Sequence, residues 1–273
     1  MTLSLNGVGY RYAGARRPSL LDVDLSLPDG TVVGVVGASE AGKTTLCLVV
    51  SGLAPRAIGG QIRGQITLDG ADIDPMPMHE LSSHIGTGFQ NPGTQLSQVS
   101  DTVFEEVAFG PMNAGLPRDE VVERTWAALD ALGIELLAER DPRRLSGGQQ
   151  QLVAIAGLLA LRPEHLVLDE PTAQLDPAGT RLVADAVARL AADGASILVT
   201  EQKTDVLAAV CSRVVALDGG RVVRDGPAAD VLADPALEDL GVTAPSTVRL
   251  VRAAERAGLA PGARARLREA LDR

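Results

Sequence analysis

A glycine-rich stretch that ends in a lysine and a threonine is the first feature of this sequence with chemical meaning. An apolar, β-branched run at 32–36 predicts a buried strand before it, and a helical pattern begins after Lys43. Glycines let consecutive backbone N–H groups point at a phosphate, and a helix N-terminus adds partial positive charge. Lys43 can reach the outer phosphates, and the hydroxyl of Thr44 can ligate Mg²⁺. The stretch matches the pattern G-x-x-x-x-G-K-S/T, with the residues Gly37, Ala38, Ser39, Glu40, Ala41, Gly42, Lys43 and Thr44.

Two further stretches carry groups suited to phosphate chemistry. The apolar run 166–168 predicts a strand that ends in Asp169 and Glu170. Asp169 suits Mg²⁺, directly or through water, and Glu170 is placed to accept a proton from an attacking water. Upstream, Ser146-Gly147-Gly148 opens a helix predicted over Gln149–Leu161 and forms another helix N-terminus that favours anions. An ordinary glycine-rich turn or acidic turn explains one of these motifs alone, but not all three in one chain.

The first part of the chain predicts strands that must lie beside the phosphate loop. Alternation of apolar and polar residues indicates an antiparallel β unit next to a nucleotide-binding core. The strands are expected at 3–12, 20–27, 65–69 and 85–89, with a loop interrupted by proline and glycine at 52–64. A flat aromatic such as Tyr12 can stack on adenine, although a half-buried strand residue is an equal reading of this position.

From Asp101 onward the apolar period becomes helical. A first helix carries Phe104 on its apolar face, and a second is predicted over Arg118–Leu132 with Trp126 in the core. This block separates the early strands from Asp169, so we expect an inserted helical subdomain. The fold class is therefore α/β: a P-loop NTPase core with a mostly parallel sheet, an N-terminal antiparallel β subdomain and an inserted α-helical subdomain.

Composition narrows the classes of protein. The 273 residues carry a net charge of −10, which disfavours nonspecific nucleic-acid binding. No uncharged apolar run reaches the length that a bilayer requires, and no secretory leader pattern opens the chain. Cys47 and Cys211 are far apart in apolar segments, and we interpret them as reduced packing residues of a cytoplasmic protein. One group of residues could form a soft-metal site: Met76, Met78, His79 and His84. A solvated loop is the preferred interpretation of this group.

The sequence LSGGQ at Leu145–Gln149, between the phosphate loop and Asp169-Glu170, resembles the signature of the ATP-binding cassette family. The resemblance covers roughly Leu3 to Leu232. It implies a nucleotide-binding domain at 1–232, with its helical subdomain at about 91–160, and a C-terminal helical extension at 233–273. A simple amphipathic cap is the alternative for the tail.

The family resemblance also implies a role for each matching residue, with ATP and Mg²⁺ as cofactors. Tyr12 would stack on adenine, Ser39 to Thr45 would wrap the phosphates, and Gln90 would sense Mg²⁺ and the attacking water. Asp169 would hold Mg²⁺ together with Thr44, and Glu170 would be the general base. Leu145, Ser146, Gly147, Gly148 and Gln149 would close over a nucleotide held by the opposite subunit, and Asp176 would cross the interface. A head-to-tail dimer with a second cassette, identical or paralogous, follows from this resemblance.

A narrower likeness concerns the residues after Gln90. Gln90-Asn91-Pro92 with Gln95, then TVFEEVAFG at 102–110 and GLP at 115–117, resembles the ATPases of energy-coupling factor (ECF) importers. Those importers take up vitamins or cobalt and nickel ions, which implies transmembrane partners near Gln90 to Gln98 and a place at the cytoplasmic face of the membrane. Gly93 and Thr94 stand where such ATPases usually carry two acidic residues.

Two departures from the family pattern matter for activity. Glu40 stands where most members have a small residue, usually glycine, and we expect its side chain to point to solvent because it would repel phosphate. The switch histidine is missing; Gln202 is aligned with it, and Glu201 is the less favoured choice. Glutamine can orient a water but cannot carry positive charge, so we expect slower hydrolysis. A mainly structural cassette beside an active paralogue is the second hypothesis. A soluble cassette acting on DNA or ribosomes is the third, disfavoured by the acidic charge and the short gap between Gln90 and Leu145.

Overall fold

The computed structural model describes residues 2–259 and contains two sheets that enclose a helix. The strand order is β2-β1-β4-β5 in one sheet and β10-β9-β3-β8-β7-β6 in the other. The strands are β1 (Leu3–Arg11), β2 (Leu20–Leu27), β3 (Val32–Val36), β4 (Gln61–Leu68), β5 (Ala71–Asp72), β6 (Ile85–Gly88), β7 (His165–Asp169), β8 (Ser196–Thr200), β9 (Arg213–Asp218) and β10 (Arg221–Pro227). The first sheet is antiparallel throughout.

The second sheet is parallel except at β10, which pairs antiparallel with β9. Strands β3, β7 and β8 are buried along their whole length, which explains why they are nearly continuous runs of Val, Leu and Ile. Because neighbouring parallel strands end at the same edge, that edge of the sheet carries Gly37 after β3, Asp169 at the end of β7 and Glu201 after β8. The sequence prediction of an α/β core with an antiparallel β subdomain is confirmed.

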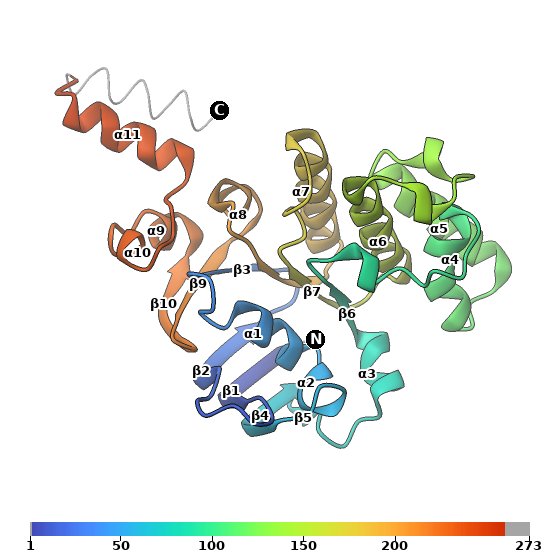
Figure 1. Ribbon diagram of the computed structural model, residues 1–273, viewed down its shortest axis with the longest axis horizontal. Coiled ribbons are helices and arrows are strands. Elements are labelled where there is room, and N and C mark those ends of the chain that lie inside the picture. Colours follow the sequence, from blue (N-terminus) through green and yellow to red (C-terminus); the bar gives the residue numbers. More distant parts are fainter. Residues whose placement is uncertain (1, 260–273) are drawn as a thin grey trace.

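Figure 1 shows how the helices are arranged around the two sheets. Helix α1 packs between the two sheets, since its buried residues share a core with β1, β2 and the strands of the parallel sheet. Helices α4 to α6 form a block on one side, and α10 and α11 lie at the other end (Figure 1). The helices are α1 (Lys43–Val50), α2 (Leu53–Arg56), α3 (Met78–His84), α4 (Val103–Asn113), α5 (Arg118–Ala131), α6 (Gly147–Leu161), α7 (Pro177–Ala192), α8 (Thr204–Val210), α9 (Ala228–Leu232), α10 (Ala236–Asp239) and α11 (Ser246–Arg256).

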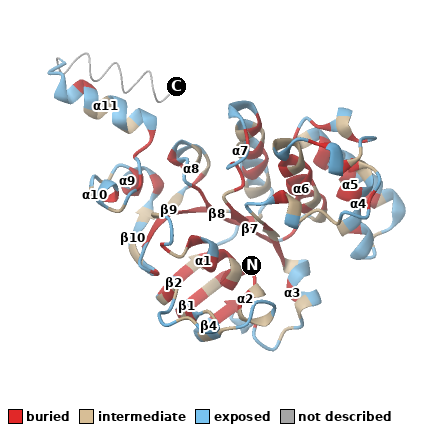
Figure 2. Ribbon diagram, in the orientation of Figure 1, coloured by how far each residue is buried: buried red, intermediate tan, exposed pale blue. Residues whose placement is uncertain are grey.

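The buried residues lie mainly in the strands and on the helix faces that pack against the sheets (Figure 2). A second core joins the other face of the parallel sheet to α6, α7 and the inner faces of α4 and α5. Within residues 2–259 no helix is both long and apolar enough to traverse a bilayer.

Several local predictions require correction. The chain at 52–64 is not only a loop: it contains α2, and β4 begins at Gln61 because pairing with β1 extends to Arg11. Met78–His84 forms helix α3, in which His84 Nδ1 lies 2.8 Å from the Glu164 carboxylate. No group of three His, Cys, Asp or Glu side chains that could hold a metal ion occurs in the described part of the chain.

Trp126 does not lie in the core. Its side chain is 43% exposed, because α5 buries Val121, Thr125 and Leu129 on its inner face. The indole packs at the edge of that face against Phe104, with ring centroids 5.2 Å apart. The predicted C-terminal helical extension is partly covered: α10 and α11 lie within it, and 260–273 lie outside the described residues.

Candidate functional site

The phosphate loop connects β3 to α1. Gly42 has φ of 108°, and a Cβ there would lie 2.8 Å from the Ser19 carbonyl oxygen, so only glycine fits. Lys43 is 6% exposed, and its Nζ donates to the carbonyls of Gly37 at 2.8 Å and Ala38 at 3.0 Å. Its ammonium is therefore held against the backbone of the loop that the sequence predicts to cradle phosphates.

Some residues in and beside this loop are exposed, and others are buried. Ser39, Glu40 and Thr44 are exposed, so the Thr44 hydroxyl is accessible to a ligand. Thr45 is buried, and its Oγ1 lies 3.1 Å from the hydroxyl of Tyr12, which is half-buried beside the loop. Glu40 has φ of 67°, a conformation that glycine adopts without strain, and its exposure agrees with the expectation that its side chain points to solvent.

Two carboxylates lie at the carboxyl end of β7, at the same edge: Asp169 is its last residue and Glu170 follows it. Asp169 is 4% exposed, and its Oδ1 accepts a hydrogen bond from Thr200 Oγ1 at 2.7 Å. Glu170 has φ of 48°, and its N–H lies 3.1 Å from both the carbonyl and the Oγ1 of Thr200. A positive φ strains the backbone of a non-glycine residue. Such strain is typical of residues whose side chains are held in place for function.

The Glu170 carboxylate is held by two side-chain amides, one from the segment after β6 and one from the segment after β8. Gln90 Nε2 donates to Oε2 at 3.0 Å, and Gln202 Nε2 donates to Oε1 at 2.9 Å and to Oε2 at 3.1 Å. These N–H donors fix the orientation of the carboxylate. The structure thus brings together three residues that are 80 and 32 positions apart in sequence.

Glu201 has a different environment from its neighbour. It is 2% exposed and accepts from Thr172 N at 2.9 Å and Thr172 Oγ1 at 2.6 Å. Burial raises the pKa of Glu201 above the ordinary glutamate value. Of the two candidates for the switch position, Gln202 contacts Glu170 and Glu201 packs behind it.

The LSGGQ stretch is not part of this cluster. Ser146 caps α6: its Oγ accepts from Gln149 N at 3.3 Å, and Gln149 Oε1 accepts from Ser146 N at 3.1 Å. Leu145 is buried, whereas Ser146 and Gly147 are exposed. Asp176 caps α7 by accepting from Gly179 N at 2.7 Å. Within residues 2–259, no hydrogen bond joins Ser146, Gln149 or Asp176 to the phosphate loop or to Glu170.

Comparison with known proteins decides the family. The profile of the ABC transporter family matches residues 20–173. The chain belongs to this family. An ABC transporter ATP-binding protein of Pyrococcus abyssi is 38% identical over 250 residues, which are 91% of this chain and 89% of the relative. The energy-coupling factor transporter ATP-binding protein EcfA of Methanothermobacter thermautotrophicus is 35% identical over 237 residues, covering 86% and 74% of the two chains.

Solved structures support the assignment of this chain to the ABC transporter family. CbiO1 from Clostridium perfringens, part of the ABC transporter complex cbiONQ, superposes with a TM-score of 0.75 at 30% identity over 92% of this chain and 98% of the other. The cassette MJ0796, solved as a dimer, has a TM-score of 0.73 at 26% identity over 83% of this chain and 98% of its own. The chain is therefore an ABC transporter ATPase, which binds and hydrolyses ATP.

Sequence reasoning missed one residue of this ABC ATPase site. Thr200 contacts both Asp169 and the backbone of Glu170 from β8. A threonine at the end of a fully buried strand is the signal that could have found it, because its hydroxyl requires a partner there. Cys47, buried in α1, has its pKa raised by burial and by the nearby Asp169, and burial raises the pKa of Cys211 to about 12. Both thiols therefore remain protonated packing groups.

Proposed function

We propose that this chain is the ATPase of an ECF-type importer, which couples ATP-driven dimer closure to uptake of a vitamin or a cobalt or nickel ion. The likeness to EcfA and to CbiO1 supports this subtype, together with the Gln90-Asn91-Pro92 segment and the TVFEEVAFG segment. The cassette would span 1–232, with 233–273 as an extension. The protein would lie at the cytoplasmic face of the membrane and would not act on nucleic acid.

The observation that carries the catalytic assignment is the Glu170 carboxylate between two amide donors. We assign Glu170 as the general base, which accepts a proton from the attacking water. Gln90 and Gln202 orient that carboxylate and the water. Lys43 and the N–H groups of Gly37 to Thr45 hold the phosphates, and Tyr12 stacks on adenine.

The donor set at this edge fits Mg²⁺, which prefers oxygen ligands. The exposed hydroxyl of Thr44 and the carboxylate of Asp169 supply such oxygens, and the amide oxygen of Gln90 is a third candidate. When bound, Mg²⁺ would neutralise charge on the phosphates during transfer. Thr200 has its own role here, because its hydrogen bond fixes the orientation of the Asp169 carboxylate.

The membrane partners would dock near Gln90 to Gln98, a segment connected to both parts of the chain. Gln90 contacts Glu170, whereas Gln95 accepts from Phe89 N at 3.0 Å and donates to the Ala154 carbonyl of α6 at 3.4 Å. A displacement of this segment by a transmembrane subunit therefore reaches both the general base and the helix that carries LSGGQ.

A composite site is the main mechanistic consequence, because the LSGGQ stretch lies apart from this chain's own phosphate loop. We propose that Leu145–Gln149 of one subunit cover the nucleotide held by Lys43 of the other, with Asp176 near the interface. The dimeric arrangement of the MJ0796 cassette supports this association.

Mixing two inactive variants tests the composite site. Lys43→Ala removes the phosphate loop function of one subunit, and Ser146→Arg obstructs the signature of the other. In a mixed dimer the two intact halves meet at one site, so a homodimer should recover about a quarter of the wild-type single-turnover rate. As the control, mixing Lys43→Ala with Glu170→Gln should restore nothing, because both changes damage the same half. If the first mixture stays inactive, and it also stays inactive when the two changes are divided between this chain and a paralogue, the composite site is wrong.

A slow or silent site is the second candidate, and it rests on Gln202, which is neutral where the family carries histidine. Glu170 with its two amide donors argues against it. In a heterodimer, loss of hydrolysis on Glu170→Gln in this chain shows an active site here. An unchanged rate, with loss on the equivalent change in the partner, shows a silent one.

A further inference from the structure

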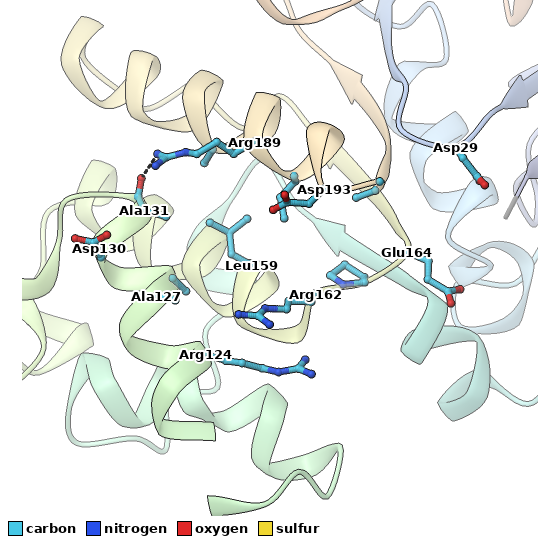
Figure 3. A pocket seen from close by; sticks show the side chains of 16 residues that line it. Asp29, Arg124, Ala127, Asp130, Ala131, Leu159, Arg162, Glu164, Arg189 and Asp193 are labelled. Atoms are coloured by element: carbon cyan, nitrogen blue, oxygen red, sulfur yellow. Dashed lines mark hydrogen bonds between the residues drawn. The ribbon is translucent and has the colours of Figure 1, made fainter. Parts of the chain in front are cut away.

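A cavity of about 550 Å³ lies between α5, the end of α6 and α7, away from the ATP site (Figure 3). The segments Asp29, Pro163-Glu164 and Gly194-Ala195, which precede β3, β7 and β8, line it from the core side. It therefore opens at the amino ends of these parallel strands, whereas the phosphate loop and Glu170 follow their carboxyl ends. No function described above uses this cavity.

One wall of the cavity is apolar. Small side chains from α5 and α7 leave room above Leu159 of α6 (Figure 3). The wall consists of Ala127, Ala128, Ala131, Leu159, Pro163 and Leu190. Such a wall suits the hydrocarbon part of a small organic molecule.

Two arginines of the cavity have hydrogen-bond donors that are not used. Arg124 pairs with Glu120 and donates from Nη1 to the Leu161 carbonyl at 3.3 Å, but its Nε is buried without a hydrogen-bond partner. Arg162, the C-cap of α6, has no side-chain partner among residues 2–259 and has φ of 50°. Arg189 differs, because it already donates to the Ala131 carbonyl at 3.0 Å.

The acidic residues of the lining do not neutralise these arginines. Glu164 pairs with His84 at 2.8 Å and points away from the other lining residues (Figure 3). Asp130 also points away, and Asp193, the C-cap residue after α7, lies across the cavity from Arg124 and Arg162 (Figure 3). On the α5–α6 side Arg162 therefore remains a cation without an acidic partner, and Arg124 is shared with Glu120. On the opposite side the Asp193 carboxylate can accept a hydrogen bond from a ligand hydroxyl or amine.

We propose that this cavity is a second ligand site, which binds a small organic anion with an apolar body. Its carboxylate or phosphate oxygens accept hydrogen bonds from Arg124 and Arg162, and its hydrocarbon part lies on the alanine and leucine wall. Charge-assisted hydrogen bonds of this kind provide the affinity, and Asp193 orients the anionic group toward α5 and α6 by repulsion.

Direct binding of three probes tests the proposal: phenylacetate, phenyl phosphate and the neutral phenylacetamide. The titrations are made by NMR on the full chain with saturating ADP, so that the phosphate loop is occupied. At least one anion should bind with a Kd of about 1 mM, and phenylacetamide should bind about ten-fold more weakly. The preferred anion distinguishes a carboxylate ligand from a phosphate ligand.

Variants assign the binding to this cavity. Arg162→Ala should weaken binding of the preferred anion about ten-fold, whereas Arg118→Ala, an exposed arginine on the same subdomain, should leave it unchanged. Ala127→Cys adds an exposed thiol to a chain whose own Cys47 and Cys211 are buried. Its alkylation by N-ethylmaleimide should slow several-fold when the anion is present. The proposal is overturned if neither anion binds, if Arg162→Ala retains full affinity, or if alkylation of the new thiol is not slowed.

Discussion

The two halves of the proposed ATP site are built differently within this one chain. In the core half, side chains at or just beyond the ends of separate strands bond to each other: Gln90 and Gln202 hold Glu170, and Thr200 holds Asp169. In the signature half, Ser146 and Gln149 bond to each other and cap their own helix. The core half is thus assembled by the tertiary structure, whereas the signature half is a local structure, which in the proposed dimer would face the nucleotide of a second subunit.

Glu170→Gln should have the largest effect on hydrolysis. That effect should be limited to the core half of the site. Hydrolysis should fall about 100-fold or more, because glutamine cannot accept the proton from water. The free energy of unfolding should change little. Single-turnover hydrolysis and urea unfolding measure the two quantities, and Glu123→Gln on exposed α5 surface is the control. A variant with undiminished hydrolysis would show that Glu170 is not the base.

Ser146→Ala tests whether the signature half has a local and an intersubunit role. Loss of the cap should cost about 1 kcal/mol of unfolding free energy. Hydrolysis should also fall about ten-fold through a lost hydrogen bond to the partner's nucleotide. Thr102→Ala is the matched control, since Thr102 caps α4 with the same reciprocal bonds to Glu105. It should lose similar stability and keep its activity; equal activity losses in both variants would contradict an intersubunit role for Ser146.

Gln202→His should raise hydrolysis a few-fold, because a protonated imidazole can offset charge on the transferring phosphate. Gln202→Ala should lower it, since Glu170 loses one of its two amide donors. Rates at several pH values decide the cause: the gain from histidine should fade as the imidazole loses its proton. If neither change alters the rate, Gln202 does not act in the core half.

Glu40→Gly should stabilise the phosphate loop by about 1 kcal/mol, because glycine accepts φ of 67° without strain. Removal of the negative charge should also lower the KM for ATP a few-fold. Glu40→Ala separates the two effects, since alanine removes the charge and keeps the strain. Thermal unfolding and steady-state kinetics provide the comparison; equal stability gains in both variants would exclude strain as the cause.

Glu201, which packs behind the core half, should make the stability of the protein depend slightly on pH. Its pKa is raised by burial, so the folded state binds the proton more tightly than the unfolded state. The resulting stability is present below the ordinary glutamate pKa of 4.5 and is lost as pH rises through the raised value. Glu201→Gln should therefore flatten the decline in Tm between acidic and neutral pH. An unchanged pH profile would show that another group is responsible.

Several features of the fold could be predicted from the sequence because they depend on the local pattern of residue types. The strand before the phosphate loop, the glycines of that loop and the helix after Ser146 follow from residues that are near each other in sequence. The position of Trp126 was not predictable, since the periodicity gave an apolar stripe wider than the face that α5 buries. The choice between Glu201 and Gln202 was also open, because adjacent residues at a strand end point to opposite sides.

The sequence by itself determined the family and the fold class, and it predicted which residues bind phosphate, because these depend on local motifs whose order along the chain is diagnostic. Only the tertiary structure decided that two glutamines just beyond the ends of separate strands orient Glu170 and that Thr200 supports Asp169. The tertiary structure also placed Arg124 and Arg162 at one cavity. Those contacts join residues far apart in the chain, and sheet order and helix packing bring them together.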